Sequence, residues 1–239
     1  MDSVSSNKPG YFSWLAHQIK GWGMWNYALF AFALGSQLMT LVNAPITVIS
    51  VVTFIGVMLG VACIVSINAV RPINGVLGII SALLLMYVGF SAKNYLSILE
   101  QLAYVVTLDL PVLIGKNKWT DNSVNEVKSF GAKEWVYSLL FTAVIFLVSS
   151  FGIQALTAEP RPFIDGLSFA ICLTAGIICY KKYNNQYFWW LASGIIQVIL
   201  WAVTFAQGNA SIAMLVSCSI YVLNDVIAFT VSPWFKHNK

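Results

Sequence analysis

Long apolar segments alternate with short polar breaks along almost the entire chain. A helix needs about 20 apolar residues to cross a bilayer, and eight segments come close to that length. The predicted spans are residues 25–43, 46–69, 73–91, 95–114, 135–157, 163–180, 187–206 and 210–231. Proline, glycine, asparagine and charged residues mark the breaks between them. The pattern predicts an all-α, polytopic membrane protein with eight transmembrane helices.

The other segments are expected at the membrane surface. Residues 1–24 are polar at first and then mix aromatic with polar side chains, which indicates an interfacial segment and not a signal peptide. Residues 115–134 form a polar loop and residues 232–239 a short tail.

The composition excludes several classes of protein. Apolar residues make up 59% of the 239 positions and charged residues 9%, whereas a soluble domain carries about 25% charged residues. The net charge of +4 gives no indication of nucleic acid as a partner. The four cysteines all lie in apolar segments, and the two histidines, His17 and His237, lie near the ends. We therefore expect no metal, no cofactor and no enzymatic centre.

The basic residues gather on one side of the predicted membrane. If successive spans alternate in direction, eleven of the 13 Lys and Arg residues fall on one side, and only Lys93 and Arg161 fall on the other. The positive-inside rule then places both termini and the 115–134 loop in the cytoplasm. This predicts a multi-pass protein of the inner membrane that contacts lipid.

A block of three spans occurs twice, shifted by 116 positions. The pairs that are difficult to obtain by chance in an apolar chain are Gly60/Gly176, Asn68/Asn184, Gly78/Gly194 and Asp109/Asp225. The offset relates the three spans within residues 46–114 to the three spans within residues 163–231. The 135–157 span is then a linker helix, and the 25–43 span is an extra N-terminal helix. Because one span separates the triplets, both have the same orientation, and the expected architecture is 1 + 3 + 1 + 3 with parallel repeats.

One face of the seventh predicted span carries the main candidate binding groups. Indole rings and an amide recur there at helical spacing, which suits a flat, polar, heterocyclic solute. Tyrosine and amide side chains occupy faces of the third, fourth and eighth spans. The candidate residues are Trp189, Trp190, Gln197, Trp201, Tyr221, Asn224, Gln101 and Asn74.

These groups also have structural interpretations. Trp189 and Trp190 lie about 100° apart on a helix, so only one can point at the axis, and Trp189 can instead face lipid. Gln197 and Asn224 can form hydrogen bonds between helices.

The acidic residues in the spans are expected to be structural. Asp109 and Asp225 lie near the predicted cytoplasmic ends, where they can pair with Lys181 or Lys182 or cap a helix end. Glu100 lies deeper, and both a proton-linked role and a pair with Lys93 are open.

A set of aromatic, amide and glycine positions carries a family resemblance. The positions are Asn68, Asn74, Gly75, Gly78, Tyr87, Phe90, Tyr95 and Gln101 in the first triplet, and Tyr187, Trp190, Gln197, Leu200 and Trp201 in the second. With these residues the chain resembles the PnuC nicotinamide riboside transporters from about residue 46 to the C-terminus. The extra helix at 25–43 is similar to that of the Neisseria-type members. The resemblance adds Phe90 to the candidate substrate-binding residues.

The resemblance implies a seven-helix core arranged three, one, three, like that of the SWEET sugar transporters, and a homotrimer. It also implies uptake of nicotinamide riboside, a vitamin B3 used in NAD biosynthesis, by facilitated diffusion. A cytoplasmic riboside kinase would then trap the substrate by phosphorylation.

The residues alone are also compatible with two other functions. One is a proton-coupled transporter of a small heterocyclic solute, resting on Glu100, Asp109 and Asp225. The other is a membrane-embedded scaffold or enzyme. It is the weakest of the three, because the sequence has no nucleophile elbow and no phosphate-binding loop.

Overall fold

The computed structural model describes residues 17–18, 20, 22–69, 71–115 and 128–231, without the side chains of residues 230 and 231. The helices of this part are α2 (Met24–Val42), α3 (Val48–Asn68), α4 (Asn74–Ser91), α5 (Tyr95–Tyr104), the π-helix η1 (Val105–Asp109), α6 (Leu110–Ile114), α7 (Ala132–Leu156), α8 (Pro162–Tyr180), α9 (Gln186–Ala206) and α10 (Ile212–Val231). Every predicted apolar span contains one of these helices, which confirms the all-α prediction. The expected interfacial segment at 1–24 and the tail at 232–239 lie almost entirely outside the described residues.

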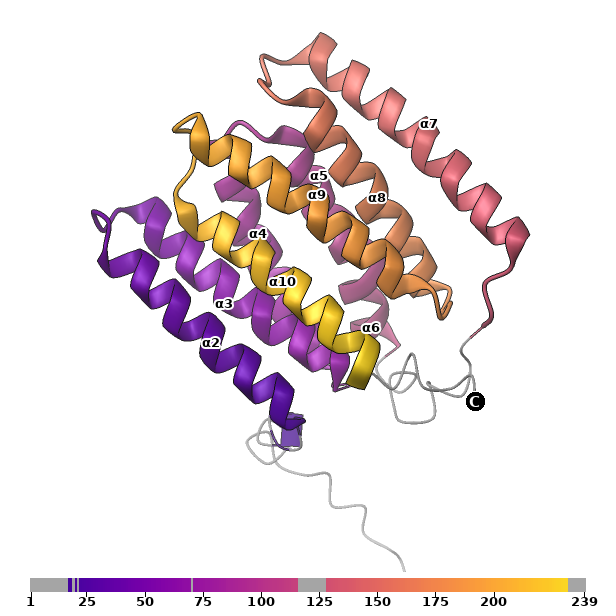
Figure 1. The fold of residues 1–239 in the computed structure, drawn as a ribbon, viewed down its shortest axis with the longest axis horizontal. Coiled ribbons are helices and arrows are strands. Elements are labelled where there is room, and N and C mark those ends of the chain that lie inside the picture. The colour runs from indigo at the N-terminus through magenta and orange to yellow at the C-terminus, as the bar shows by residue number, and fades with distance from the viewer. Residues whose placement is uncertain (1–16, 19, 21, 70, 116–127, 232–239) are drawn as a thin grey trace, which may run out of the picture.

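The helices pack side by side, and most of them form a closed ring (Figure 1). Helix α3 packs on α4 and α10, and α9 packs on α8 and α10. The continuous segment α5–η1–α6 closes the ring between α4 and α8. Helix α2 lies outside this ring against α3 and α10, and α7 lies outside it against α8, so the two occupy opposite edges of the bundle.

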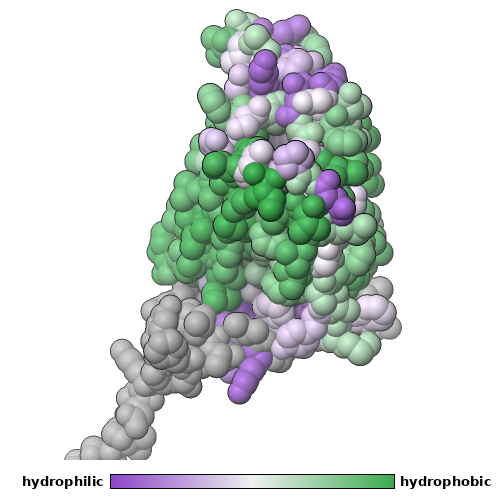
Figure 2. All heavy atoms as spheres, turned by 90° about the vertical axis from the view of Figure 1, so that its left-hand side faces the viewer, coloured by the Kyte–Doolittle hydropathy of each residue, from purple (hydrophilic) through white to green (hydrophobic). Residues whose placement is uncertain are grey.

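The surface of the bundle carries a broad apolar band. Seven of the described helical segments are long and apolar enough to cross a membrane, counting α5–η1–α6 as one. Figure 2 shows the band on one face, with hydrophilic residues gathered at its upper end and at its lower border. The band has the pattern expected of a protein surrounded by lipid.

Helix α2 forms where the first span was predicted, but it is not among these seven segments. Its apolar sequence is interrupted by Asn26, Gln37 and Thr40. The amides of Asn26 and Gln37 are buried, and Gln37 Nε2 donates to the carbonyl of Ala213 on α10 at 3.1 Å. The outer side of α2, away from the bundle, carries exposed apolar side chains such as Phe32. Helix α2 therefore turns its polar residues toward the bundle.

The segment α5–η1–α6 contains one turn of π-helix, Val105–Asp109. Pro111 follows it near the start of α6, and a proline lacks the N–H group that would continue the regular α-helical hydrogen bonds. The wider turn shifts the register of the residues that follow Tyr104. Single π-turns of this kind occur frequently at functional sites.

A buried arginine joins several helix ends at one end of the bundle. Arg161 is 4% exposed and precedes α8. Its Nη2 donates to the carbonyl of Ala92 at 2.7 Å, and its Nε donates to Asn94 Oδ1 at 2.9 Å. Its Nη1 donates to the side chain of Gln207 at the end of α9. One side chain thus connects the α4–α5 turn, the α7–α8 turn and the end of α9.

Two acidic side chains beside Arg161 cap the start of α5. Glu159 Oε2 accepts from the backbone N–H of Tyr95 at 3.1 Å, and Asp165 Oδ2 accepts from that of Leu96 at 2.9 Å. Burial, followed by the charge of Asp165, raises the pKa of Glu159 to about 8. The first N–H groups of α5 therefore find partners across the bundle.

Candidate functional site

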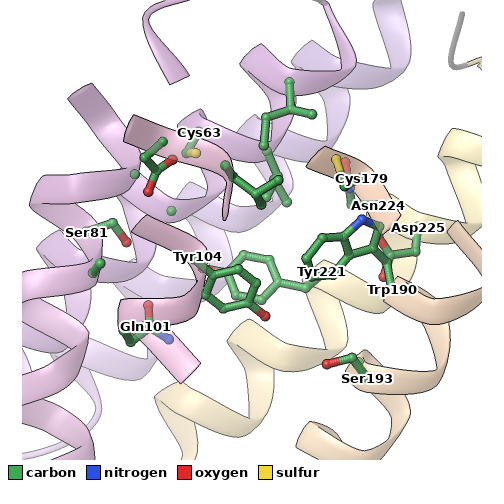
Figure 3. A pocket seen from close by; sticks show the side chains of 18 of the residues that line it. Cys63, Ser81, Gln101, Tyr104, Cys179, Trp190, Ser193, Tyr221, Asn224 and Asp225 are labelled. Carbon is green, nitrogen blue, oxygen red and sulfur yellow. The ribbon is translucent and has the colours of Figure 1, made fainter. Parts of the chain in front are cut away.

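A cavity lies inside the ring of helices (Figure 3). Its wall is formed by the C-terminal parts of α3 and α10, the middle of α5–η1–α6, the N-terminal parts of α4 and α9 as far as Leu85 and Gln197, and the end of α8. The cavity thus extends from the middle of the bundle toward one end, and the Arg161 cluster lies at the other end. The polar and aromatic lining groups include Asn68, Ser81, Gln101, Tyr104, Asp109, Gln186, Tyr187, Trp190, Ser193, Gln197, Tyr221, Asn224 and Asp225.

An aromatic wall spans the two halves of the ring. Tyr104 on α5 and Trp190 on α9 are stacked, with ring centroids 5.6 Å apart and an angle of 27° between the planes. Tyr221 on α10 also points into the cavity (Figure 3). Flat aromatic faces of this kind bind flat rings by stacking.

A chain of hydrogen bonds lies behind this wall. Gln197 Nε2 donates to Glu100 Oε1 at 2.5 Å and to the hydroxyl of Tyr104 at 3.3 Å. Glu100 is 2% exposed and also accepts from Ser168 Oγ. Glu100 is therefore held by Gln197 and Ser168, whereas Lys93 is exposed. These hydrogen bonds hold Gln197 and Tyr104 at the cavity wall.

An amide pair borders the cavity near the ends of α3 and α10. Asn68 Nδ2 donates to Asn224 Oδ1 at 2.7 Å, and the hydroxyl of Tyr187 donates to Asn68 Oδ1 at 3.4 Å. These contacts join α3 to α10 and to α9 at the end of the bundle toward which the cavity extends.

Two carboxylates, Asp109 and Asp225, line the cavity at positions that the 116-residue offset pairs in the sequence. The carboxyl group of Asp109 packs directly against Gly78 on α4, where a Cβ atom would overlap it. On the other side, a Cβ on Gly194 of α9 would lie 3.6 Å from Asp225 Oδ2. Both aspartates were expected to be structural and not to touch the substrate. They line the cavity wall, and their role stays a prediction.

The structure brings together five of the nine candidate residues. Gln101, Trp190, Gln197, Tyr221 and Asn224 all line the cavity. Their role in binding a substrate stays a prediction, because the geometry shows only that they share one concave site.

The other four candidates lie elsewhere. Trp189 is buried and stacked on Trp135 of α7 at 5.8 Å, so it is neither at the cavity nor in lipid. Trp201 is buried in the apolar core formed mainly by α3, α4 and α10. Asn74 is 2% exposed and its carbonyl accepts from Cys63 Sγ, while Phe90 is 62% exposed.

Several lining residues were missed as candidates from the sequence. Asp109 and Asp225 were recognised as a repeat match but not as part of the site. Tyr104 lies beside the predicted face of the fourth span, and the π-turn follows it directly. The signal that could have found the aspartates was the coincidence of matched glycine and aspartate pairs, because a glycine in a packed helix commonly marks a close approach.

The comparisons with known proteins agree with this fold. A family profile described as nicotinamide mononucleotide transporter matches residues 50–236. A nicotinamide riboside transporter PnuC from Neisseria mucosa is 23% identical over 228 residues, which cover 90% of this chain and 83% of that protein. The PnuC protein of Haemophilus influenzae is 25% identical over 219 residues, covering 88% of this chain and 90% of the relative.

A solved structure has the same fold. The crystal structure of the vitamin B3 transporter PnuC superposes with a TM-score of 0.78 at 22% identity, over 95% of this chain and 97% of that one. At this identity the likeness shows the fold, while the profile match extends over most of the chain. The chain therefore belongs to the nicotinamide mononucleotide transporter family, the PnuC family that its sequence resembles.

Proposed function

We propose that this protein carries nicotinamide riboside across the inner membrane by facilitated diffusion. The observation that carries the proposal is the cavity inside the helix ring, whose wall combines the Tyr104–Trp190 stack with amide and hydroxyl groups. The curated relatives that match most of the chain are named as nicotinamide riboside transporters.

The chemistry of the wall suits the two parts of this solute. The pyridine ring is flat and stacks on an indole or a phenol. The ribose and the carboxamide need donors and acceptors, which Gln101, Ser193 and Asn224 provide in the same cavity. We assign the pyridine ring to a stack on Trp190, and the ribose and carboxamide to hydrogen bonds with these three side chains.

Transport through such a site would use the two halves of the ring as parallel repeats, α3 to α6 and α8 to α10. Residues 163–231 would repeat residues 46–114, with α7 as linker and α2 as the extra helix. The helix contacts support this division, because the first helix of each proposed repeat packs on the third helix of the other.

The basic end of the bundle would face the cytoplasm, so the cavity would lie in the cytoplasmic half. We expect single cysteines in the 115–134 loop and at either terminus to react with impermeant thiol reagents only after the membrane is opened. A cysteine at exposed Lys93 should react in intact cells and serves as the control. Labelling of the loop in intact cells would contradict the proposed orientation.

Uptake would be driven by consumption of the riboside, through a cytoplasmic riboside kinase that phosphorylates it. In proteoliposomes without kinase, labelled riboside should enter until the internal and external concentrations are equal. An imposed pH difference should leave that end point unchanged. Accumulation above equality when the outside is acidic would favour the alternative, a proton-coupled transporter.

The assembly would be a homotrimer, as the family resemblance implies. Helix α7 packs mainly on α8 and leaves apolar side chains such as Leu140, Val148 and Leu156 exposed, so they can meet lipid or a neighbouring subunit. The mass of the detergent-solubilised particle, measured by light scattering, tests this state.

A further inference from the structure

We propose that Asp109 and Asp225 set the charge selectivity of the cavity, so that it accepts a flat organic cation in preference to an uncharged solute of the same shape. The inference rests on the proposed function and assigns its specificity to two side chains. N-ribosylation gives the pyridine ring a permanent positive charge, so the proposed substrate belongs to this class.

The two carboxylates are placed by the fold at corresponding positions. Each lies on the third helix of a sequence repeat and faces a glycine of the second helix, Gly78 for Asp109 and Gly194 for Asp225. A side chain at Gly78 would overlap the carboxyl group of Asp109. Gly78 therefore lets the Asp109 carboxylate sit against the helix backbone, Asp225 lies near Gly194, and both carboxylates border the same cavity.

The charges around the cavity are one-sided. Among the described residues that line it, Asp109 and Asp225 are the acidic ones, and none is Lys, Arg or His. Buried Glu100 lies directly behind Gln197, through the 2.5 Å hydrogen bond. A positive ring between these groups favours their ionised form and is stabilised by it, and a phosphate group would be repelled, because charges interact more strongly when water is excluded.

The aromatic wall favours the same ligand. Trp190, Tyr104 and Tyr221 bring three aromatic rings to the cavity lining. The face of an aromatic ring attracts a cation within about 6 Å of its centre. Stacking alone would not distinguish a charged ring from a neutral one so strongly.

A separate feature indicates that a polar ligand occupies this space. Ser193 on α9 is 2% exposed, lines the cavity, and its Oγ has no hydrogen-bond partner in the described structure. Figure 3 shows Ser193 on the same wall as Trp190 and Asp225. A buried hydroxyl without a partner is unfavourable, and a ligand hydroxyl or amide would satisfy it.

The selectivity has a consequence for the reaction that consumes the substrate. Transfer of a phosphoryl group to the ribose gives a product whose phosphate charge outweighs the ring charge. The carboxylates would then exclude the product, so phosphorylation inside the cell would prevent its return through the same cavity.

The test compares two ligands that differ in charge but hardly in shape: nicotinamide riboside and the uncharged benzamide C-riboside. Their affinities are measured by calorimetry for the purified full chain, for Asp109→Asn and for Asp225→Asn. Glu134→Gln is the matched control, because Glu134 lies at the start of α7, away from the cavity, and glutamine can keep its bond to the Gly131 N–H. Both aspartate changes keep the size of the side chain.

The wild type should bind the cation about tenfold or more tightly than the neutral analogue, as expected for a charge pair at an effective dielectric constant near 20. Each aspartate variant should lose most of that preference and bind the neutral analogue as before, while Glu134→Gln keeps the preference. Partial unfolding lowers the active fraction for both ligands alike, so the ratio of affinities remains informative.

Equal affinity of the wild type for both ligands, or an unchanged ratio in both aspartate variants, would overturn the inference and leave the proposed function standing. Failure of the folded wild type to bind either ligand would instead overturn the proposed function, and the inference with it.

Discussion

Trp190→Ala should weaken the binding of nicotinamide riboside by about 1–3 kcal/mol, the range found for bases that stack on aromatic side chains. Trp190 lines the cavity and is stacked on Tyr104, so its removal takes away one face of the aromatic wall. Calorimetric titration of the detergent-purified variant measures the change. The bundle should stay folded, because Trp190 lies at a cavity and is only partly buried.

Two other tryptophans provide controls for this experiment. Trp25 is 55% exposed on α2, so Trp25→Ala should leave riboside affinity unchanged. Trp189 packs on Trp135, so Trp189→Ala should lower stability and not affinity. Normal affinity in folded Trp190→Ala, together with a loss in Trp189→Ala, would show that the wrong indole has been assigned to the substrate.

Arg161→Ala should lower the free energy of unfolding by about 3–5 kcal/mol, the usual effect of removing one partner from a buried set of charges. The guanidinium group is buried, holds Ala92 and Asn94, and lies near the carboxylates of Glu159 and Asp165. Its loss would leave these acceptors without their donor and the carboxylates without their positive neighbour.

Denaturant unfolding of the variant in detergent measures this loss. Lys181→Ala removes a positive charge from an exposed position at the end of α8 and is the control, with an expected effect within about 0.5 kcal/mol. An Arg161→Ala protein as stable as the wild type would show that this cluster does not hold the helix ends together.

The helices could be predicted from the sequence because each needs only a long apolar run between polar breaks. The Gly78/Gly194 and Asp109/Asp225 pairs of the predicted repeat also pointed to the cavity, since all four residues line its wall. What the sequence could not provide was the direction of each side chain relative to the other helices.

Trp201 shows the limit of the helical-face argument. It shares a face with Trp190 and Gln197, but it lies farther along α9, where this face meets the apolar core and not the cavity. The cavity reaches only partway along α9. The spacing of residues along the sequence predicts which face they share, but not how far along the helix a cavity extends. In the fourth span a π-turn follows Tyr104, and Leu108 and Asp109 within it line the cavity.

Buried polar groups were difficult to assign for a related reason. Asn74 and Glu100 are both almost inaccessible, and neither lines the cavity. The backbone carbonyl of Asn74 accepts from Cys63, while its side-chain Oδ1 has no hydrogen-bond partner in the described structure, and Glu100 accepts from Gln197. A polar side chain in a membrane span needs a partner, but only the packed structure shows whether that partner is another helix or a ligand.

The most direct test of the proposed function is a titration of the purified wild-type protein with nicotinamide riboside, nicotinamide and NAD. We expect saturable binding of the riboside, much weaker binding of nicotinamide, which lacks the ribose and the ring charge, and no binding of NAD, whose phosphates the carboxylates of the cavity repel. Absence of riboside binding by the folded protein, or tighter binding of NAD than of the riboside, would contradict the account.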